Sequence, residues 1–196
     1  MTRAERNRAA ETEIRRMTRR LVALHAETTA ADLAAGIRWY DRARQAARAM
    51  AIEGDVESAA AVIAHLSPRE QWASNVAKAA RVLTAAAEGA TECPAVHTFA
   101  QRTKAWAVAT GQADIWADHG PKTEAFLANI LGDVERVCVD SWAARAATGD
   151  MSHRGPRRRA QYELFERAYQ QAARIVGMAP RDLQAAIWIH VRGAAD

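Results

Sequence analysis

A lysine and an aspartate stand 18 residues apart, at positions 122 and 140, in a chain with three lysines and 24 arginines. A neutral lysine amine can attack the anomeric carbon of a nucleoside. A carboxylate can stabilise the cationic sugar that forms as an N-glycosidic bond breaks. Arginine could supply charge at position 122, but not a neutral amine. Lys122 and Asp140 are therefore the first candidates for chemistry in this chain.

The segment before Lys122 predicts how this lysine is positioned. His119-Gly120-Pro121 is typical of a tight turn, with a proline at the first position of the next helix. The first turn of a helix favours the neutral amine that a nucleophile needs. Its backbone N–H groups also suit a phosphate oxygen. One short unit could thus bind DNA and present a nucleophile.

Asp140 ends the apolar run Val-Cys-Val-Asp and precedes a predicted helix that extends to Gly149. An aspartate at this place commonly caps the helix, which is a structural role. The pattern leaves two interpretations open, a cap alone or a cap that also acts on a substrate.

The elements around these residues are predicted to be helices. Ala and Arg dominate the chain, Gly and Pro are few, and β-branched runs are almost absent, so we predict an all-α fold. In Ser67-Pro68-Arg69-Glu70, a serine cap, a proline and a glutamate predict a helix start by three signals. We expect helices at about residues 3–27, 56–66, 67–88, 98–109, 113–117, 122–131, 140–149, 160–176 and 180–192. A further helix contains residues 37–40 and ends at about residue 50.

Composition limits the partners and the location. The net charge of +4 and the pI near 9.5 favour a polyanionic partner modestly. Two cysteines cannot build a four-Cys site, and His25, His65, His97, His153 and His190 lack metal-ligand spacing, so we expect no metal and no cofactor. No run approaches 18 apolar residues and the first twenty residues are charged, so we expect a cytoplasmic protein and no membrane partner.

The segment from Ala113 to Gly149 resembles the helix-hairpin-helix DNA glycosylases of the endonuclease III-like superfamily. In that family a hairpin is followed by Lys-Thr-Ala, then by Val-Asp-Thr-His and an Arg three residues beyond the His. The bifunctional members use the same Lys-to-Asp interval of 18 residues. The matching residues here are Gly120, Lys122 and Thr123, then Val139-Asp140-Ser141-Trp142 and Arg145.

A second resemblance lies upstream, and the whole covers roughly residues 55–150. The stretch VIAHLSPREQWASNVAKAARVL is similar to the family's L-L-S-x-Q-…-N helix pair. The chain is also similar to a set of phage and actinobacterial proteins with comparable Lys and Asp segments.

The chain departs from the family pattern at four places. The hairpin keeps the second of two glycines, Gly120, and Trp142 replaces the histidine after the aspartate. The glutamine that often fills the gap left by an extruded base corresponds to Arg69, with Gln71 nearby. The four-Cys iron–sulfur loop of endonuclease III is missing.

The resemblance implies one two-lobed glycosylase-like domain over residues 1–196. Lobe A would be residues 30–133 and lobe B residues 1–29 with 134–196, with Lys122 and Asp140 facing one cleft. The implied partner is double-stranded DNA with a flipped base, bound by a monomer. The expected DNA-binding residues are Gly120, His119, Thr123, Arg69, Gln71 and Arg145. Trp142 and Trp116 are expected at the substrate pocket, whereas Trp39, Trp72, Trp106 and Trp188 are expected in the core.

Three functions remain open on these residues. The first is excision of a damaged or modified base, with Lys122 as nucleophile and Asp140 as its electrostatic partner. The second is a phage thymine-hypermodification transferase, which replaces an activated 5-hydroxymethyluracil substituent with an amine or amino acid in the host cytoplasm. The third is a non-catalytic DNA-binding or partner-inhibiting protein, to which an intact Lys and Asp pair would be superfluous. The Arg-rich residues 3–20 and the basic run RGPRRR are either solvated surface or sites of non-specific phosphate contact.

Overall fold

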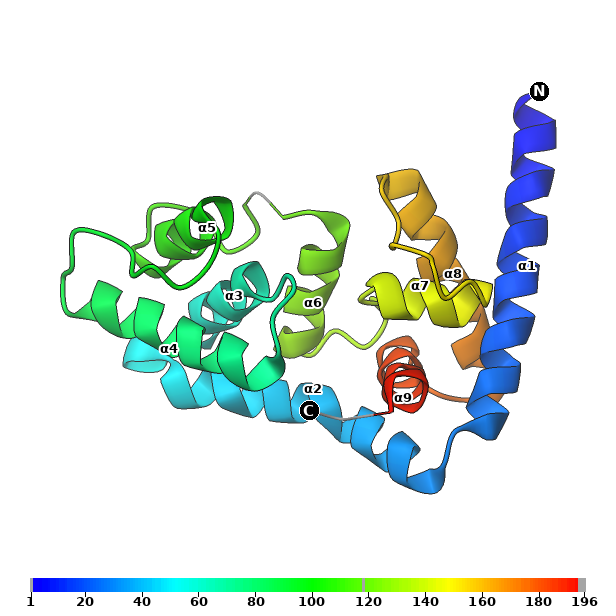
Figure 1. Cartoon of the computed structure of the whole chain (residues 1–196), viewed down its shortest axis with the longest axis horizontal. Coiled ribbons are helices and arrows are strands. Elements are labelled where there is room, and N and C mark those ends of the chain that lie inside the picture. Colours follow the sequence, from blue (N-terminus) through cyan, green and yellow to red (C-terminus); the bar gives the residue numbers. More distant parts are fainter. Residues whose placement is uncertain (1, 118, 194–196) are drawn as a thin grey trace. The chain divides into compact units, whose positions relative to one another are not determined.

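A computed structural model describes residues 2–117 and 119–193 of the chain. Within this part the structure contains nine α-helices, one 3₁₀-helix and no strand, which confirms the predicted all-α class (Figure 1). The elements are α1 Arg3–Glu27, α2 Ala30–Met50, η1 Ile52–Gly54, α3 Val56–Leu66, α4 Trp72–Ala87, α5 Phe99–Ala109, α6 Pro121–Leu131, α7 Ser141–Thr148, α8 Arg159–Val176 and α9 Pro180–Arg192.

The described residues divide into two compact units. Unit 1 comprises residues 2–39 and 133–193, and unit 2 comprises residues 40–117 and 119–132. The long helix α2 begins in unit 1 and ends in unit 2. Lys122 therefore belongs to unit 2 and Asp140 to unit 1, and the cleft expected between them stays a prediction.

Unit 1 is built from α1, α7, α8 and α9 with the start of α2. Helix α1 packs along α8, and α7 packs against α1, α8 and α9. Helix α7 buries four alanines, which lets its neighbours come close. The approach of α2 to α9 is closer still, because a Cβ on Gly36 would lie 2.5 Å from the backbone of Ala186.

Unit 2 is organised around α3, whose residues 59–66 are all buried. Helices α4, α5 and α6 pack against it (Figure 1). Half of this buried stretch is alanine, so several helices can pack against one short helix without leaving voids.

The predicted helix start at Ser67 is wrong. Ser67 instead ends α3, with its N–H and its Oγ both donating to the carbonyl of Ala64. Arg69 then adopts a left-handed backbone conformation with φ of +64°, and α4 begins only at Trp72. The three local signals failed because α3 extends up to Ser67, so the chain must first turn back toward α3.

The predicted short helix at 113–117 is also wrong, because these residues form turns. The carboxylate of Asp114 accepts a hydrogen bond of 2.8 Å from the N–H of Trp116. An aspartate that binds the backbone two residues ahead favours a turn over a helix. Asp118, within the predicted hairpin, lies outside the described residues. The other predicted helices are confirmed, with ends that agree to within one or two residues where an end was predicted.

The close approach at Gly36 gives a test of the unit 1 packing. In an open helix, Gly36→Ala would raise stability by up to about 1 kcal/mol through helix propensity. Here the added Cβ would meet the α9 backbone, so we expect the free energy of unfolding to fall by about 1–3 kcal/mol. Urea unfolding followed by circular dichroism measures the change. A stabilised Gly36→Ala variant would contradict the packing of α2 on α9.

Candidate functional site

Lys122 is the second residue of α6, directly after Pro121. Gly120 precedes the helix in an extended conformation and provides no capping side chain. A ligand oxygen can therefore occupy the position that a capping oxygen takes at other helix starts. The side chains of Lys122 and Thr123 are half-buried, whereas Gly120 is exposed.

His119 holds the turn before Lys122 against the core of unit 2. Its Nε2 donates a hydrogen bond of 2.7 Å to the carbonyl of Ile115. Its ring stacks on the ring of His65, with 4.1 Å between centroids. His65 lies on α3 and is 2 % exposed. Burial, together with the nearby His119 and Lys104, lowers the pKa of His65 to about 3, so this support stays uncharged.

Asp140 caps α7, as one of the two interpretations predicts. Its Oδ1 accepts a hydrogen bond of 2.8 Å from the N–H of Ala143. Its Oδ2 accepts one of 3.2 Å from the indole nitrogen of Trp188 on α9. Both carboxylate oxygens are thus fixed by donors from two helices.

Two buried tyrosines of α8 hold the backbone around Asp140. The phenol of Tyr162 accepts from the N–H of Val139 and donates to the carbonyl of Val137. The phenol of Tyr169 donates to the carbonyl of Ala143. Burial raises the pKa of both phenols, and the charge of Asp140 raises that of Tyr169 further, so both stay protonated.

Trp188, which sequence reasoning placed in the core, is half-buried and bonds the candidate residue Asp140. Besides its bond to Asp140, its ring contacts the edge of the Trp39 ring, with 6.4 Å between centroids. The guanidinium of Arg192 lies 4.6 Å from its centroid. A tryptophan 48 residues from its partner gives no local sequence signal, so only the packing of α9 reveals this contact.

Trp142 and Arg145 form a stacked pair on α7 in unit 1. The guanidinium of Arg145 lies 4.7 Å from the centroid of the Trp142 ring, and its Nε donates to the carbonyl of His153. Trp116, the other residue expected at the pocket, belongs to unit 2, where it is exposed in the turns after α5.

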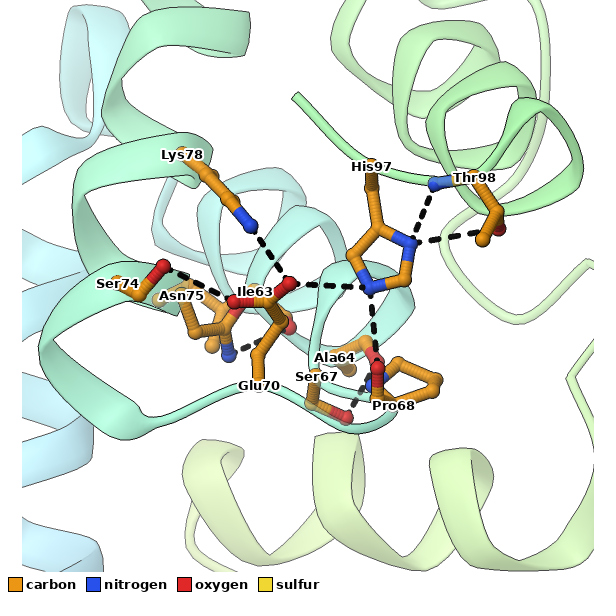
Figure 2. Close-up of polar contacts among 10 residues, drawn as sticks. All are labelled: Ile63, Ala64, Ser67, Pro68, Glu70, Ser74, Asn75, Lys78, His97 and Thr98. Atoms are coloured by element: carbon orange, nitrogen blue, oxygen red, sulfur yellow. Dashed lines mark hydrogen bonds and ion pairs between the residues drawn. The ribbon is translucent and has the colours of Figure 1, made fainter. Parts of the chain in front are cut away.

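Arg69 and Gln71 are exposed in the α3–α4 loop of unit 2. A residue other than glycine in the left-handed region costs about 1–2 kcal/mol, so the surrounding contacts must hold Arg69 there. Figure 2 shows the first of these contacts, a hydrogen bond of 3.0 Å from His97 Nε2 to the carbonyl of Pro68. The ring of His97 is in turn oriented by the N–H of Thr98, which donates to Nδ1.

Glu70 fixes the other side of the loop. Its carboxylate accepts hydrogen bonds of 2.5 Å from Lys78 Nζ and 2.9 Å from Ser74 Oγ (Figure 2). His97 Nε2 lies 3.6 Å from the same carboxylate. The hydrogen bond from Lys78 is the main reason that the pKa of Glu70 falls below its ordinary value. Sequence reasoning missed Lys78 and His97, although the rarity of lysine in this chain was a signal.

The described residues contain no group of three or more His, Cys, Asp or Glu side chains that could hold a metal ion. In the same part of the chain, every helix is too short or too polar to cross a membrane.

Comparison with known proteins gives one match. The model of a family of unknown function (DUF7178) matches residues 3–195 of the chain. No curated protein and no solved structure matches it.

The Glu70 contacts predict a pH dependence of stability. Because the folded pKa of Glu70 is lowered, its contribution is present above its ordinary value near 4.5 and is lost as the pH falls through the folded pKa. Glu70→Gln should therefore lose less stability than the wild type on acidification below about pH 5. Urea unfolding at a series of pH values measures this difference. Glu88→Gln, an exposed change in the same unit, should follow the wild type, and a Glu70→Gln profile identical to both would refute the contact.

Proposed function

We propose that this chain, which belongs to the DUF7178 family, is a DNA-base-acting enzyme that flips a modified base and excises it with Lys122 and Asp140. The observation that carries the proposal is the placement of these two residues at the starts of helices α6 and α7, 18 residues apart. This layout agrees with the helix-hairpin-helix glycosylase resemblance of the sequence.

The contacts of Asp140 support its part in this reaction. A carboxylate stabilises a developing sugar cation best when it is oriented before the reaction begins. The N–H donors of Ala143 and Trp188 orient both oxygens of Asp140. The carboxylate still has lone pairs for a substrate, because each oxygen accepts more than one hydrogen bond.

The place of Lys122 supports the role of nucleophile. Its neutral amine would attack C1′ of the flipped nucleotide, and the electron pair of the breaking bond would leave with the base. The attached amine would then lose a proton, the C1′–O4′ bond would break and O4′ would take up a proton, which gives an iminium ion whose nitrogen is Lys122 Nζ. The backbone N–H groups at the start of α6 would bind the phosphate next to the flipped nucleotide.

Two other functions on the same residues are distinguished by their products. The base-modifying transferase is favoured by Trp142, which replaces the family histidine, and by the hairpin with one glycine fewer. In that reaction an amine or amino acid supplied as co-substrate takes the place of the released substituent, so the mass of the base changes and no abasic site appears. A non-catalytic DNA-binding protein would leave both the base and the sugar unchanged. Nucleoside mass spectrometry separates all three after incubation, in the presence of amines and amino acids, with duplexes that carry uracil, 5-hydroxymethyluracil, its phosphorylated form or oxidised bases.

Lys122 should decide which chemistry occurs. With a glycosylase-lyase, borohydride should trap a covalent protein–DNA adduct by reducing the iminium ion. Lys122→Arg should abolish the adduct with binding nearly intact, because arginine keeps the charge but lacks a neutral amine. Asp140→Asn should slow base release on the order of a hundredfold or more. Lys104→Arg makes the same exchange on α5 and should still give the adduct, whereas full activity in Lys122→Arg would remove Lys122 from the mechanism.

DNA binding should weaken steeply with salt. The net charge of +4 and the arginines of α1 and of residues 154–159 favour contacts to phosphates. Each phosphate neutralised contributes a slope of about −0.9 to the logarithm of affinity against the logarithm of salt concentration. Fluorescence anisotropy with a labelled duplex measures this slope. Affinity that is unchanged from low to physiological salt, or no binding, would refute every DNA function proposed for this chain.

A further inference from the structure

The loop between α7 and α8 in unit 1 lines an open hollow of about 330 Å³. This volume lies at the lower end of the roughly 300–1,000 Å³ of small-molecule sites. Its lining consists of polar residues, two arginines and one glycine, without any carboxylate: Ser152, His153, Arg154, Gly155, Arg157 and Gln161.

Hydrogen bonds within the loop give this hollow a fixed frame. The carbonyl of His153 accepts from Arg145 Nε, and its Nδ1 accepts a bond of 3.0 Å from the N–H of Gly155. The His153 ring also packs edge-on against Phe165 of α8. At the far side, the N–H of Arg157 donates to the side chain of Gln161. The backbone of the loop is therefore fixed before any ligand arrives, which lowers the entropic cost of binding.

Two arginines give the hollow a positive charge. Arg154 and Arg157 are exposed, and neither forms an ion pair within the described residues. The nearest acidic residue in sequence, Asp150, bonds Ser152 and does not line the hollow. Because His153 Nδ1 accepts a bond, the donor of this ring is its Nε2. Two guanidinium groups with further donors are suited to the oxygens of a phosphate.

Gly155, which lines the hollow, lies against the backbone at the start of α7. A Cβ on Gly155, which has a φ of +90°, would lie 3.5 Å from the backbone nitrogen of Ser141 and 3.7 Å from the carbonyl carbon of Asp140. A phosphate held by the loop would thus lie beside the start of α7, where the Asp140 carboxylate is fixed.

We infer that the hollow binds one specific DNA phosphate, next to the nucleotide whose sugar faces Asp140. Arg154 and Arg157 are its ligands. The nature of the ligand rests on the proposed function, but the affinity of the hollow for a phosphate group does not. The basic loop is then a site for a single phosphate, in contrast to a general attraction for polyanions.

The first test uses inorganic phosphate and the full chain. Phosphate replaces chloride at constant ionic strength while the backbone amide resonances are followed by NMR. We expect saturable shifts confined to residues 152–161, which disappear in the double variant Arg154→Gln/Arg157→Gln. Two controls, Arg158→Gln in the same loop and Arg174→Gln on α8, remove exposed charges outside the hollow and should keep the shifts. No saturable shift, or equal loss in the controls, would overturn the inference.

The second test asks whether the phosphate is that of DNA. Duplexes in which one phosphate at a time is replaced by an uncharged methylphosphonate are bound to the wild type and to the double variant. We expect one position at which the substitution weakens the wild type but not the double variant, while other positions weaken both equally. The variant should also lower the salt slope by about 1. Additive losses at every position would overturn the DNA assignment.

The two tests separate this inference from the proposed function. If the wild type binds no duplex, the proposed function is refuted. The phosphate titration then shows by itself whether the hollow binds phosphate. Circular dichroism and thermal unfolding of the double variant test whether its fold is intact, which we expect because both arginines are exposed and neither guanidinium bonds another described residue.

Discussion

A buried or half-buried carboxylate is costly unless donors surround it, and the arrangement of unit 1 around Asp140 meets this requirement. One oxygen binds the backbone of α7 and the other binds the indole of Trp188, so two helices meet at a single charge. The tyrosines of α8 hold the adjoining backbone, and the alanines of α7 let α8 and α9 come near enough to do so. The orientation of the carboxylate is therefore a product of the whole unit and not of its helix alone.

Unit 2 achieves a similar result with an uncharged support. Helix α3 is buried along residues 59–66. The turn before Lys122 contacts this helix, and the turn at Arg69 follows its end. The neutral ring of His65 supports the turn before Lys122, and the end of α3 leads into the strained turn at Arg69. A protonated His65 would place a charge in a core of alanines, valine and isoleucine. Its lowered pKa keeps the support of the turn constant over the physiological pH range.

Local patterns predicted local features well. Helix α1 followed from the periodicity of its apolar residues. The end of α8 followed from Gly177 and the start of α9 from Pro180. The cap of α7 followed from an aspartate directly before the helix. Ser67 was misread, because its signals are shared by a helix start and by the end of a helix that continues from upstream. Trp188, Lys78 and His97 act through partners far along the chain or through a loop, so no short pattern could reveal them. The pairing of Lys122 with Asp140 across the two units stays a prediction.

All three lysines of the chain, at positions 78, 104 and 122, lie in unit 2, while the side-chain cations of unit 1 are arginines and histidines. Amine-selective reagents will therefore mark the ε-amino groups of one half of the molecule only. A lysine-specific protease will likewise cut between residues 78 and 123 and leave the long helices of unit 1 whole. The uneven distribution of lysine thus lets the two units be distinguished by chemical modification without any engineered tag.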